Sequence, residues 1–170
     1  MRRKVIVFDF IYWHFHMHSD IIVNDNTILI VTGSTLPAEQ YDRPLAYKMR
    51  KEIFKTFTEI SALDINPTPP DVIVLSDLWY LNSEQLHDLP TISIGGPKSN
   101  GVSAFYYNKL DHKLSVNDTV LIQMDPFLQN LKVAIWGQDP LSTQEAIDLF
   151  VKQSYLTDFV SAVSRNYNQI

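Results

Sequence analysis

The chain has no cysteine among its 170 residues, which excludes a disulfide framework, a thiolate metal site and a cysteine nucleophile. It also lacks any run of the ~18 apolar residues that a membrane-spanning helix needs. The basic start, Met1 to Lys4, precedes an apolar stretch as in a secretion signal, but Asp9 interrupts that stretch and no small-residue cleavage site follows. We therefore expect a cytoplasmic protein without a membrane partner.

Charged residues are scarce as well. They form 19% of the chain, below the ~25% typical of soluble domains, and the net charge is −5. The chain has no overall positive field, so the composition does not favour a nucleic-acid partner. Hydrophobic residues reach 45% and aromatic residues 12%, which excludes intrinsic disorder and predicts a single α/β domain over residues 1–170.

Short β-branched segments alternate with helical patterns along the chain. Strands are expected over residues 4–18, 27–32, 71–75, 91–94, 116–124 and 133–136. Helices are expected over residues 37–60, 83–89, 99–110 and 142–152 and in a terminal segment, and a capping box of Ser142 with Glu145 opens the fourth. This alternation is typical of a three-layer α/β sandwich with a largely parallel sheet, Rossmann-like or flavodoxin-like. An N-terminal β-hairpin over residues 21–32 leaves a mixed sheet open.

Glycine is rare and unevenly placed. Three of the four strand exits begin with glycine, although the chain has only five glycines. In open α/β sheets, ligands bind beyond the carboxyl ends of the strands. The segment from Gly95 to Gly101 can form an anion-binding loop, although it matches neither the P-loop nor the dinucleotide-binding spacing. The alternative is that these glycines only make tight strand-to-helix turns.

We predict that a nucleotide-like or other anionic small molecule binds at the strand carboxyl ends; no cofactor is identified. The residues expected to line this site are Gly33, Ser34, Gly95, Gly96, Lys98, Ser99 and Asn100. Asp77 is the candidate catalytic carboxylate for hydrolysis or glycosyl transfer, because it follows a buried strand and precedes Trp79 and Tyr80, whose rings can stack on a base. The alternative is that Asp77 caps the next turn.

Other charged residues and histidines allow further interpretations. Arg43 can hold a phosphate through two hydrogen bonds, or form an ion pair within or between helices. His14, His16 and His18 alternate along the first predicted strand, and two such imidazoles, ~6.5–7 Å apart, can share a metal. A metal-dependent hydrolase is therefore a third hypothesis, although the spacing matches no complete metal signature and no metal ligand is assigned.

A non-catalytic protein-interaction domain that forms a homodimer is the main alternative to a ligand-binding domain. It rests on the low charge fraction, the aromatic content and an apolar stripe of Tyr155, Phe159 and Val163 in the terminal helix. Such a stripe predicts a partner only if it is exposed, because an apolar stripe usually packs on its own sheet.

Two resemblances to known families bear on the fold. Ile94-Gly95-Gly96-Pro97 with Asn100, followed by Gly137 and a helix containing Thr143, resembles segments of archaeal surface-layer proteins over residues 90–150. The layout is also similar to the nucleoside deoxyribosyltransferase and TIR-like group, flavodoxin-type folds that handle nucleosides or nicotinamide dinucleotide. That group's catalytic glutamate motif has no counterpart here, so the resemblance implies a fold and a ligand class and assigns no catalytic residue.

Overall fold

The computed structural model describes residues 26–62, 67–110, 113–116 and 118–167. The strand expected over residues 4–18 lies outside the described residues, and so do His14, His16 and His18. The first arm of the expected N-terminal hairpin also lies outside them. The metal-dependent hydrolase hypothesis therefore stays a prediction.

The described residues form a six-stranded mixed sheet in the order β2-β1-β3-β6-β5-β4. Its strands are β1 (Thr27–Thr32), β2 (Asp71–Ser76), β3 (Thr91–Ile94), β4 (Lys113–Val116), β5 (Val120–Met124) and β6 (Lys132–Gly137). Strands β2, β1, β3 and β6 are parallel, and β5 and β4 continue the sheet as antiparallel strands. The α/β fold with a largely parallel sheet is thus confirmed.

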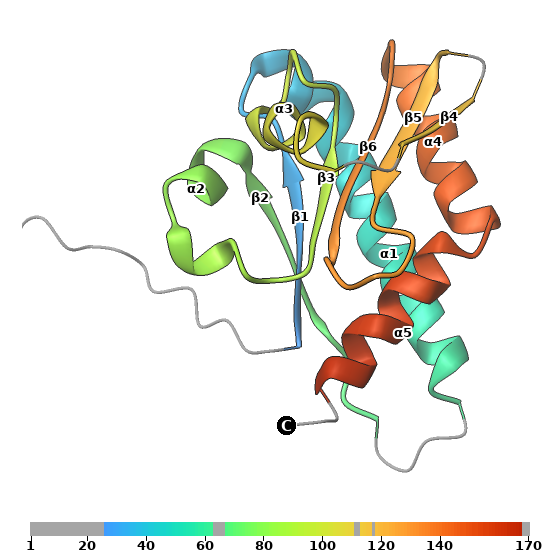
Figure 1. Ribbon diagram of the computed structural model, residues 1–170. Helices are drawn as coiled ribbons and strands as arrows, with labels where there is room; N and C mark the ends of the chain where they lie inside the picture. The colour runs from blue at the N-terminus through green and yellow to red at the C-terminus, as the bar shows by residue number, and fades with distance from the viewer. Residues whose placement is uncertain (1–25, 63–66, 111–112, 117, 168–170) are drawn as a thin grey trace, which may run out of the picture.

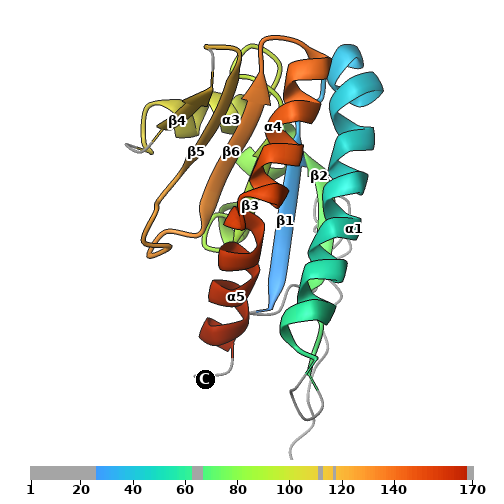
Figure 2. The ribbon, with the colours of Figure 1, turned by 90° about the vertical axis from the view of Figure 1, so that its right-hand side faces the viewer.

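Helices cover both faces of this sheet, which makes three layers (Figures 1 and 2). The helices α1 (Arg43–Ile60), α4 (Pro140–Lys152) and α5 (Tyr155–Tyr167) pack on one face. The short helices α2 (Asp77–Leu81), η3 (Glu84–Leu86) and α3 (Gly101–Tyr107) pack on the other. Alternate residues of a strand point to opposite faces, so Ile28 and Ile30 enter the first core and Leu29 and Val31 the second.

The order of the strands places the carboxyl-end loops. Helix α1 connects β1 to β2, and the chain then returns past β1 through α2 and η3 to β3. The direction of winding therefore reverses between β1 and β3, the place where open α/β sheets bind ligands. The last pair in register there is Thr32 with Ile94, so the loops that begin at Gly33 and Gly95 leave the sheet side by side.

Several element boundaries differ from those expected. The strand predicted over residues 116–124 is divided into β4 and β5, with Asp118 between them at a φ of 54°. Helix α4 begins at Pro140, and its capping box joins Asp139 to Ser142, so the predicted box of Ser142 with Glu145 is wrong. The helix expected from residue 37 begins with a π-helical turn, η2 (Ala38–Asp42), before α1.

The terminal helix does not present its apolar stripe to solvent. Phe159 and Val163 are buried in the core that α5 forms with α1 and α4, and Tyr155 packs against the same core. The argument for a homodimer from this stripe is therefore wrong, because the stripe is covered by the chain itself. Of the helices in the described part of the chain, none has both the length and the apolar character that crossing a bilayer requires.

Candidate functional site

A cavity of about 770 Å³ lies beyond the carboxyl ends of β3 and β6. Its walls come from the start of η2, the loop after β3, α3 and the connection from β6 to α4. The lining residues are Pro37, Ala38, Tyr41, Asp42, Gly96, Pro97, Lys98, Ser99, Tyr107, Trp136, Gly137, Gln138, Asp139, Pro140 and Thr143. Three of the residues predicted from the sequence, Gly96, Lys98 and Ser99, are among them.

Gly95 lies directly behind this wall. Its φ is +100°, a conformation that favours glycine. A Cβ atom on Gly95 would lie 2.4 Å from Oδ2 of Asp42 and 3.3 Å from Oγ of Ser99. Glycine at this position therefore allows the Asp42 carboxyl group to approach the loop backbone.

Gly33 and Ser34 lie outside the lining of this cavity. A Cβ atom on Gly33 would lie 1.8 Å from the carbonyl oxygen of Ser99, so the loops after β1 and β3 touch at that point. Ser34 is exposed on the loop after β1. The two loops are therefore in contact at the reversal of strand order, and the cavity extends from the segment after β1 to the connection after β6.

Asn100 also lies outside the cavity lining and is 1% exposed. Its Nδ2 donates hydrogen bonds to the carbonyl oxygens of Val31 (3.1 Å) and Ile94 (2.9 Å). Its Oδ1 accepts hydrogen bonds from the backbone N–H groups of Val102 and Ser103. Asn100 thus joins the ends of β1 and β3 to the start of α3, and both ends of its side-chain amide are engaged within the protein.

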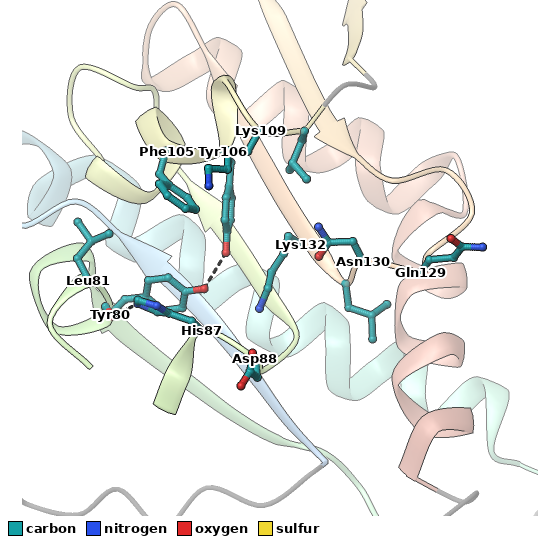
Figure 3. A pocket seen from close by; sticks show the side chains of 12 residues that line it. Tyr80, Leu81, His87, Asp88, Phe105, Tyr106, Lys109, Gln129, Asn130 and Lys132 are labelled. Carbon is teal, nitrogen blue, oxygen red and sulfur yellow. Dashed lines mark hydrogen bonds between the residues drawn. The ribbon is translucent and has the colours of Figure 1, made fainter. Parts of the chain in front are cut away.

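Asp77 is buried, and both of its carboxylate oxygens accept hydrogen bonds. Oδ1 accepts from the N–H of Leu78 and Oδ2 from the N–H of Gly101, each at 2.8 Å. The side chain therefore links α2 to the start of α3. The N-cap of the next turn is Ser76 and not Asp77. Of the neighbouring rings, Trp79 is partly exposed, while Tyr80 is buried with its hydroxyl 2.8 Å from that of Tyr106 (Figure 3). Asp77 is not among the residues that line the cavity.

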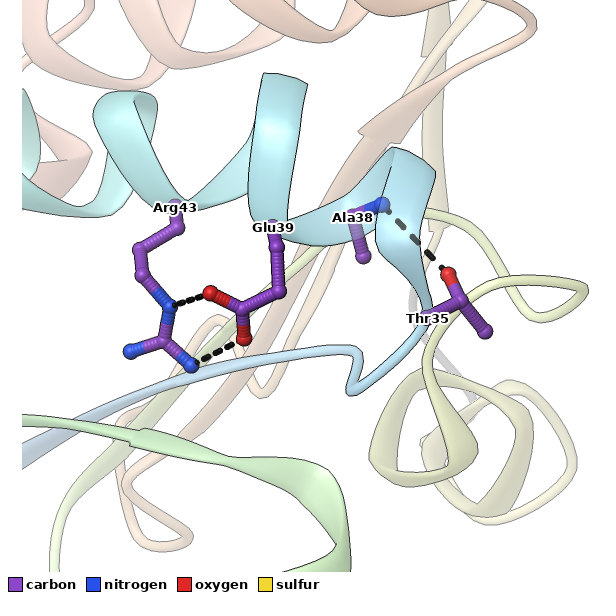
Figure 4. Close-up of polar contacts among 4 residues, drawn as sticks. All are labelled: Thr35, Ala38, Glu39 and Arg43. Carbon is purple, nitrogen blue, oxygen red and sulfur yellow. Dashed lines mark hydrogen bonds and ion pairs between the residues drawn. The ribbon is translucent and has the colours of Figure 1, made fainter.

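Arg43 forms an ion pair within its own helix. Its guanidinium donates two hydrogen bonds to the carboxylate of Glu39, at 2.5 and 2.6 Å (Figure 4). This pairing lowers the pKa of Glu39 through the hydrogen bond from Arg43. The start of the same segment is held by Thr35, whose Oγ1 accepts a hydrogen bond from the N–H of Ala38. Arg43 does not line the cavity, so the ion-pair interpretation describes this residue.

Asp42, the residue before Arg43, does line the cavity. It is only 7% exposed, and burial raises the pKa of its carboxyl group to about 6, from an ordinary value of 3.8. A sequence signal for it exists: Asp42 precedes Ala46 by four residues, and Met49 and Ile53 continue that buried stripe. Tyr41, the residue before Asp42, is 46% exposed and does not belong to this buried stripe.

Asp139 is the second carboxyl group of the cavity. Unlike Asp42, it is exposed. The backbone N–H and hydroxyl of Ser142 donate hydrogen bonds to its carboxylate, and they lower the pKa of Asp139. The cavity thus holds one carboxyl group whose pKa is raised and one whose pKa is lowered. Such a difference is typical of acid–base pairs in enzymes, in which the two groups take different roles.

Aromatic side chains form another part of the wall. The rings of Tyr107 and Trp136 lie 6.3 Å apart between centroids, at an angle of 53°. The indole Nε1 of Trp136 is buried and has no hydrogen-bond partner within the described part of the chain. Buried donors of this kind are usually satisfied, so this indole nitrogen is an exception within the described residues.

Within the described residues, no group of three histidine, aspartate or glutamate side chains is placed to hold a metal ion. No protein-family model matches the chain, and no curated protein matches it at a significant level. Inference about function therefore depends on the geometry of the cavity.

Proposed function

We propose that the chain binds a nucleotide-like molecule in the cavity beyond β3 and β6, and hydrolyses or transfers its glycosyl group. The observation that carries this proposal is Asp42, a buried carboxyl group in the cavity wall whose pKa is raised to about 6. Strongly perturbed carboxyl groups in clefts are candidates for acid–base catalysis. The volume, about 770 Å³, is within the range of small-molecule sites.

The charges around the cavity indicate how such a ligand is oriented. Asp42 and Asp139 face a single lysine, Lys98, which is exposed. Two carboxyl groups favour the neutral, hydroxyl-bearing sugar and disfavour a phosphate beside them. The phosphate is therefore expected at the mouth of the cavity, on Lys98. Tyr107 and Trp136 offer aromatic rings to the base.

The proposed chemistry is displacement at the anomeric carbon of the sugar. The Asp42 carboxylate takes a proton from water as the water oxygen forms a bond to that carbon. The bond between the carbon and the nitrogen of the base breaks, its electron pair leaves with the nitrogen, and the proton is passed on to that nitrogen. A base with a pKa near the working pH is suited to both proton transfers. Asp139 stays ionised and stabilises the positive charge that develops on the sugar.

The test is to incubate the purified chain with nucleoside monophosphates and to measure release of free base by chromatography, with binding followed by NMR chemical shifts. Asp42→Asn is expected to lower turnover by about 10²-fold or more and to keep binding. Lys98→Met is expected to weaken binding of the phosphorylated ligand, while Lys55→Met, on the exposed side of α1, leaves it unchanged.

A comparison of Asp77→Asn with Asp42→Asn shows which of these two carboxyl groups turnover depends on. Loss of turnover in a folded Asp77→Asn variant, with normal turnover in Asp42→Asn, would restore the carboxylate predicted from the sequence and refute the role of Asp42. No shift of any cavity residue with nucleotides or nucleosides would refute the binding proposal itself.

A second candidate function is self-association through the face that carries α2 and α3. Four large apolar side chains on these helices are 41–59% exposed: Leu78, Trp79, Leu81 and Phe105. The two helices are adjacent, since a Cβ atom on Gly101 would lie 3.0 Å from Cδ1 of Leu81. Exposed apolar side chains that gather on one face are typical of an interaction surface, and a second copy of this chain is the partner we propose for it.

A further inference from the structure

A second cavity, of about 560 Å³, lies at the opposite end of the sheet from the cavity discussed above. It opens on the face covered by α2 and α3, where β3 and β6 begin (Figure 3). Residues from the loops before these two strands complete its walls. No residue lines both cavities, so an inference about the second is independent of the nucleotide-like ligand proposed for the first. The second cavity does share Leu81 and Phe105 with the face proposed for self-association.

Lys132, the first residue of β6, reaches into this cavity. Its ammonium group donates hydrogen bonds to the carbonyl oxygen of Leu89 and to Oγ1 of Thr91. Both acceptors are uncharged, and among the described residues no carboxylate lies within ion-pair distance of Lys132. Asp88 acts on it only at longer range, and burial lowers the pKa of Lys132 to about 8.

A partly desolvated ammonium group without a counter-charge is costly to the protein. Two of its three N–H groups have partners within the protein. In Figure 3 the side chain points toward Tyr80 and Asp88, into the space of the cavity. An anionic group bound there would accept the third hydrogen bond and supply the missing negative charge.

The remaining walls are mostly aromatic and apolar. The hydroxyl groups of Tyr80 and Tyr106 are hydrogen-bonded to each other at 2.8 Å, and burial keeps the pKa of Tyr106 well above its usual range. Phe105 and Leu131 add apolar surface to the lining. Asp88 stands at the same cavity and disfavours a ligand with several negative charges.

We propose that this second cavity binds an aromatic monocarboxylate. Its carboxylate pairs with the ammonium group of Lys132, and its ring packs against Tyr80, Tyr106 and Phe105. Two lysines line the cavity, but Lys109 places its amine over the Phe105 ring, so Lys132 is the cation assigned to the carboxylate, and the aromatic walls set the shape of the ligand's body. Such a site lies away from the strand carboxyl ends and is additional to the nucleotide-like ligand proposed there.

The experiment uses pairs of probes that differ in charge and share a shape: phenylacetate with phenylacetamide, and indole-3-acetate with indole-3-acetamide. Binding to the whole chain is followed by NMR chemical shifts. Each acid is expected to bind more tightly than its amide by about ten-fold or more, the effect of one charge-assisted hydrogen bond. Lys132→Met is expected to remove this preference.

Lys109→Met is the matched control, because Lys109 lines the same cavity but places its amine over the Phe105 ring, 4.7 Å from the centroid. It is expected to leave the preference for the acid in place. Equal binding of acid and amide, failure of both to bind, or a response to inorganic phosphate alone would overturn the proposal.

If Lys132→Met does not fold, the proposal is tested on the unmodified chain instead. The Lys132 amine is labelled with ¹³C at Cε, and its titration is followed with and without indole-3-acetate. The proposal requires the bound acid to raise the pKa of Lys132 from about 8, because the carboxylate favours the charged amine. An unchanged pKa in the presence of saturating indole-3-acetate would refute the pairing.

Discussion

At the scale of single residues, Asp42 is the position where the proposed function and the stability of the fold oppose each other. Its pKa in the folded chain is about 6, above the ordinary value of 3.8. The folded state therefore binds the proton more tightly than the unfolded state does. Asp42 therefore lowers the free energy of unfolding when it is ionised. This loss of stability grows as the pH rises from about 4 to 6 and is fully present above that range.

Replacing this carboxyl group should stabilise the protein at neutral pH. We expect Asp42→Asn to raise the free energy of unfolding by about 1 kcal/mol at pH 7.5, a value discounted for residual contact with water. Little change is expected at pH 4, where Asp42 is protonated in the folded state. Urea denaturation at both pH values measures the effect, with Glu59→Gln, an exposed position, as control. An equal effect at both pH values would contradict the assignment.

Gly95 and Gly96 provide a second comparison between single residues. Gly95→Ala places a methyl group against Oδ2 of Asp42 in a conformation with φ +100°, and is expected to cost about 1–3 kcal/mol of stability. In Gly96→Ala the nearest atom belongs to the Trp136 ring, at 3.5 Å, so little loss is expected. Thermal unfolding of the two variants checks this difference, and equal losses would argue against the close approach of Asp42 to the loop.

At the scale of elements, the loop after β3 is the most strongly connected segment at the carboxyl edge. Asn100 links β1, β3 and α3 through its amide, and Asp77 links α2 to the same helix. These polar residues follow strands, and for that reason the sequence predicted them as ligand-binding. In the structure they hold elements together, while the neighbouring Gly96, Lys98 and Ser99 face the cavity.

Asn100→Ala should therefore destabilise the fold as a whole. The change removes two hydrogen bonds to buried carbonyl groups and the N-cap of α3, for an expected loss of about 2–4 kcal/mol. Asn108→Ala, at the exposed end of the same helix, is expected to change stability by no more than about 0.5 kcal/mol. Urea denaturation compares the two, and a small loss in Asn100→Ala would contradict the linking role.

At the scale of the whole molecule, apolar side chains on α2 and α3 remain exposed while both core clusters are closed. Trp79 is the largest of them and is 44% exposed. If this face joins two copies, the chain sediments as a dimer, and Trp79→Glu converts it to a monomer because a charge cannot be buried unpaired at an interface.

Phe127→Glu is the control for this prediction. Phe127 is 79% exposed and lies on the connection between β5 and β6, so it belongs to neither α2 nor α3. Its replacement should leave the dimer intact in sedimentation experiments. A monomer at high concentration in the unmodified chain would refute self-association.

The sequence by itself determined the layer architecture and most elements, because β-branched runs and helical periodicity act over a few neighbouring residues. It also identified the loop from Gly95 to Gly101 as a part of the carboxyl edge. The cavity residues Asp42, Ser99 and Trp136 come from three separate segments, so only the strand order, which depends on packing between distant elements, brings them together. The raised pKa of Asp42 was likewise decided by tertiary structure, because burial is a property of the assembled fold and not of the local sequence.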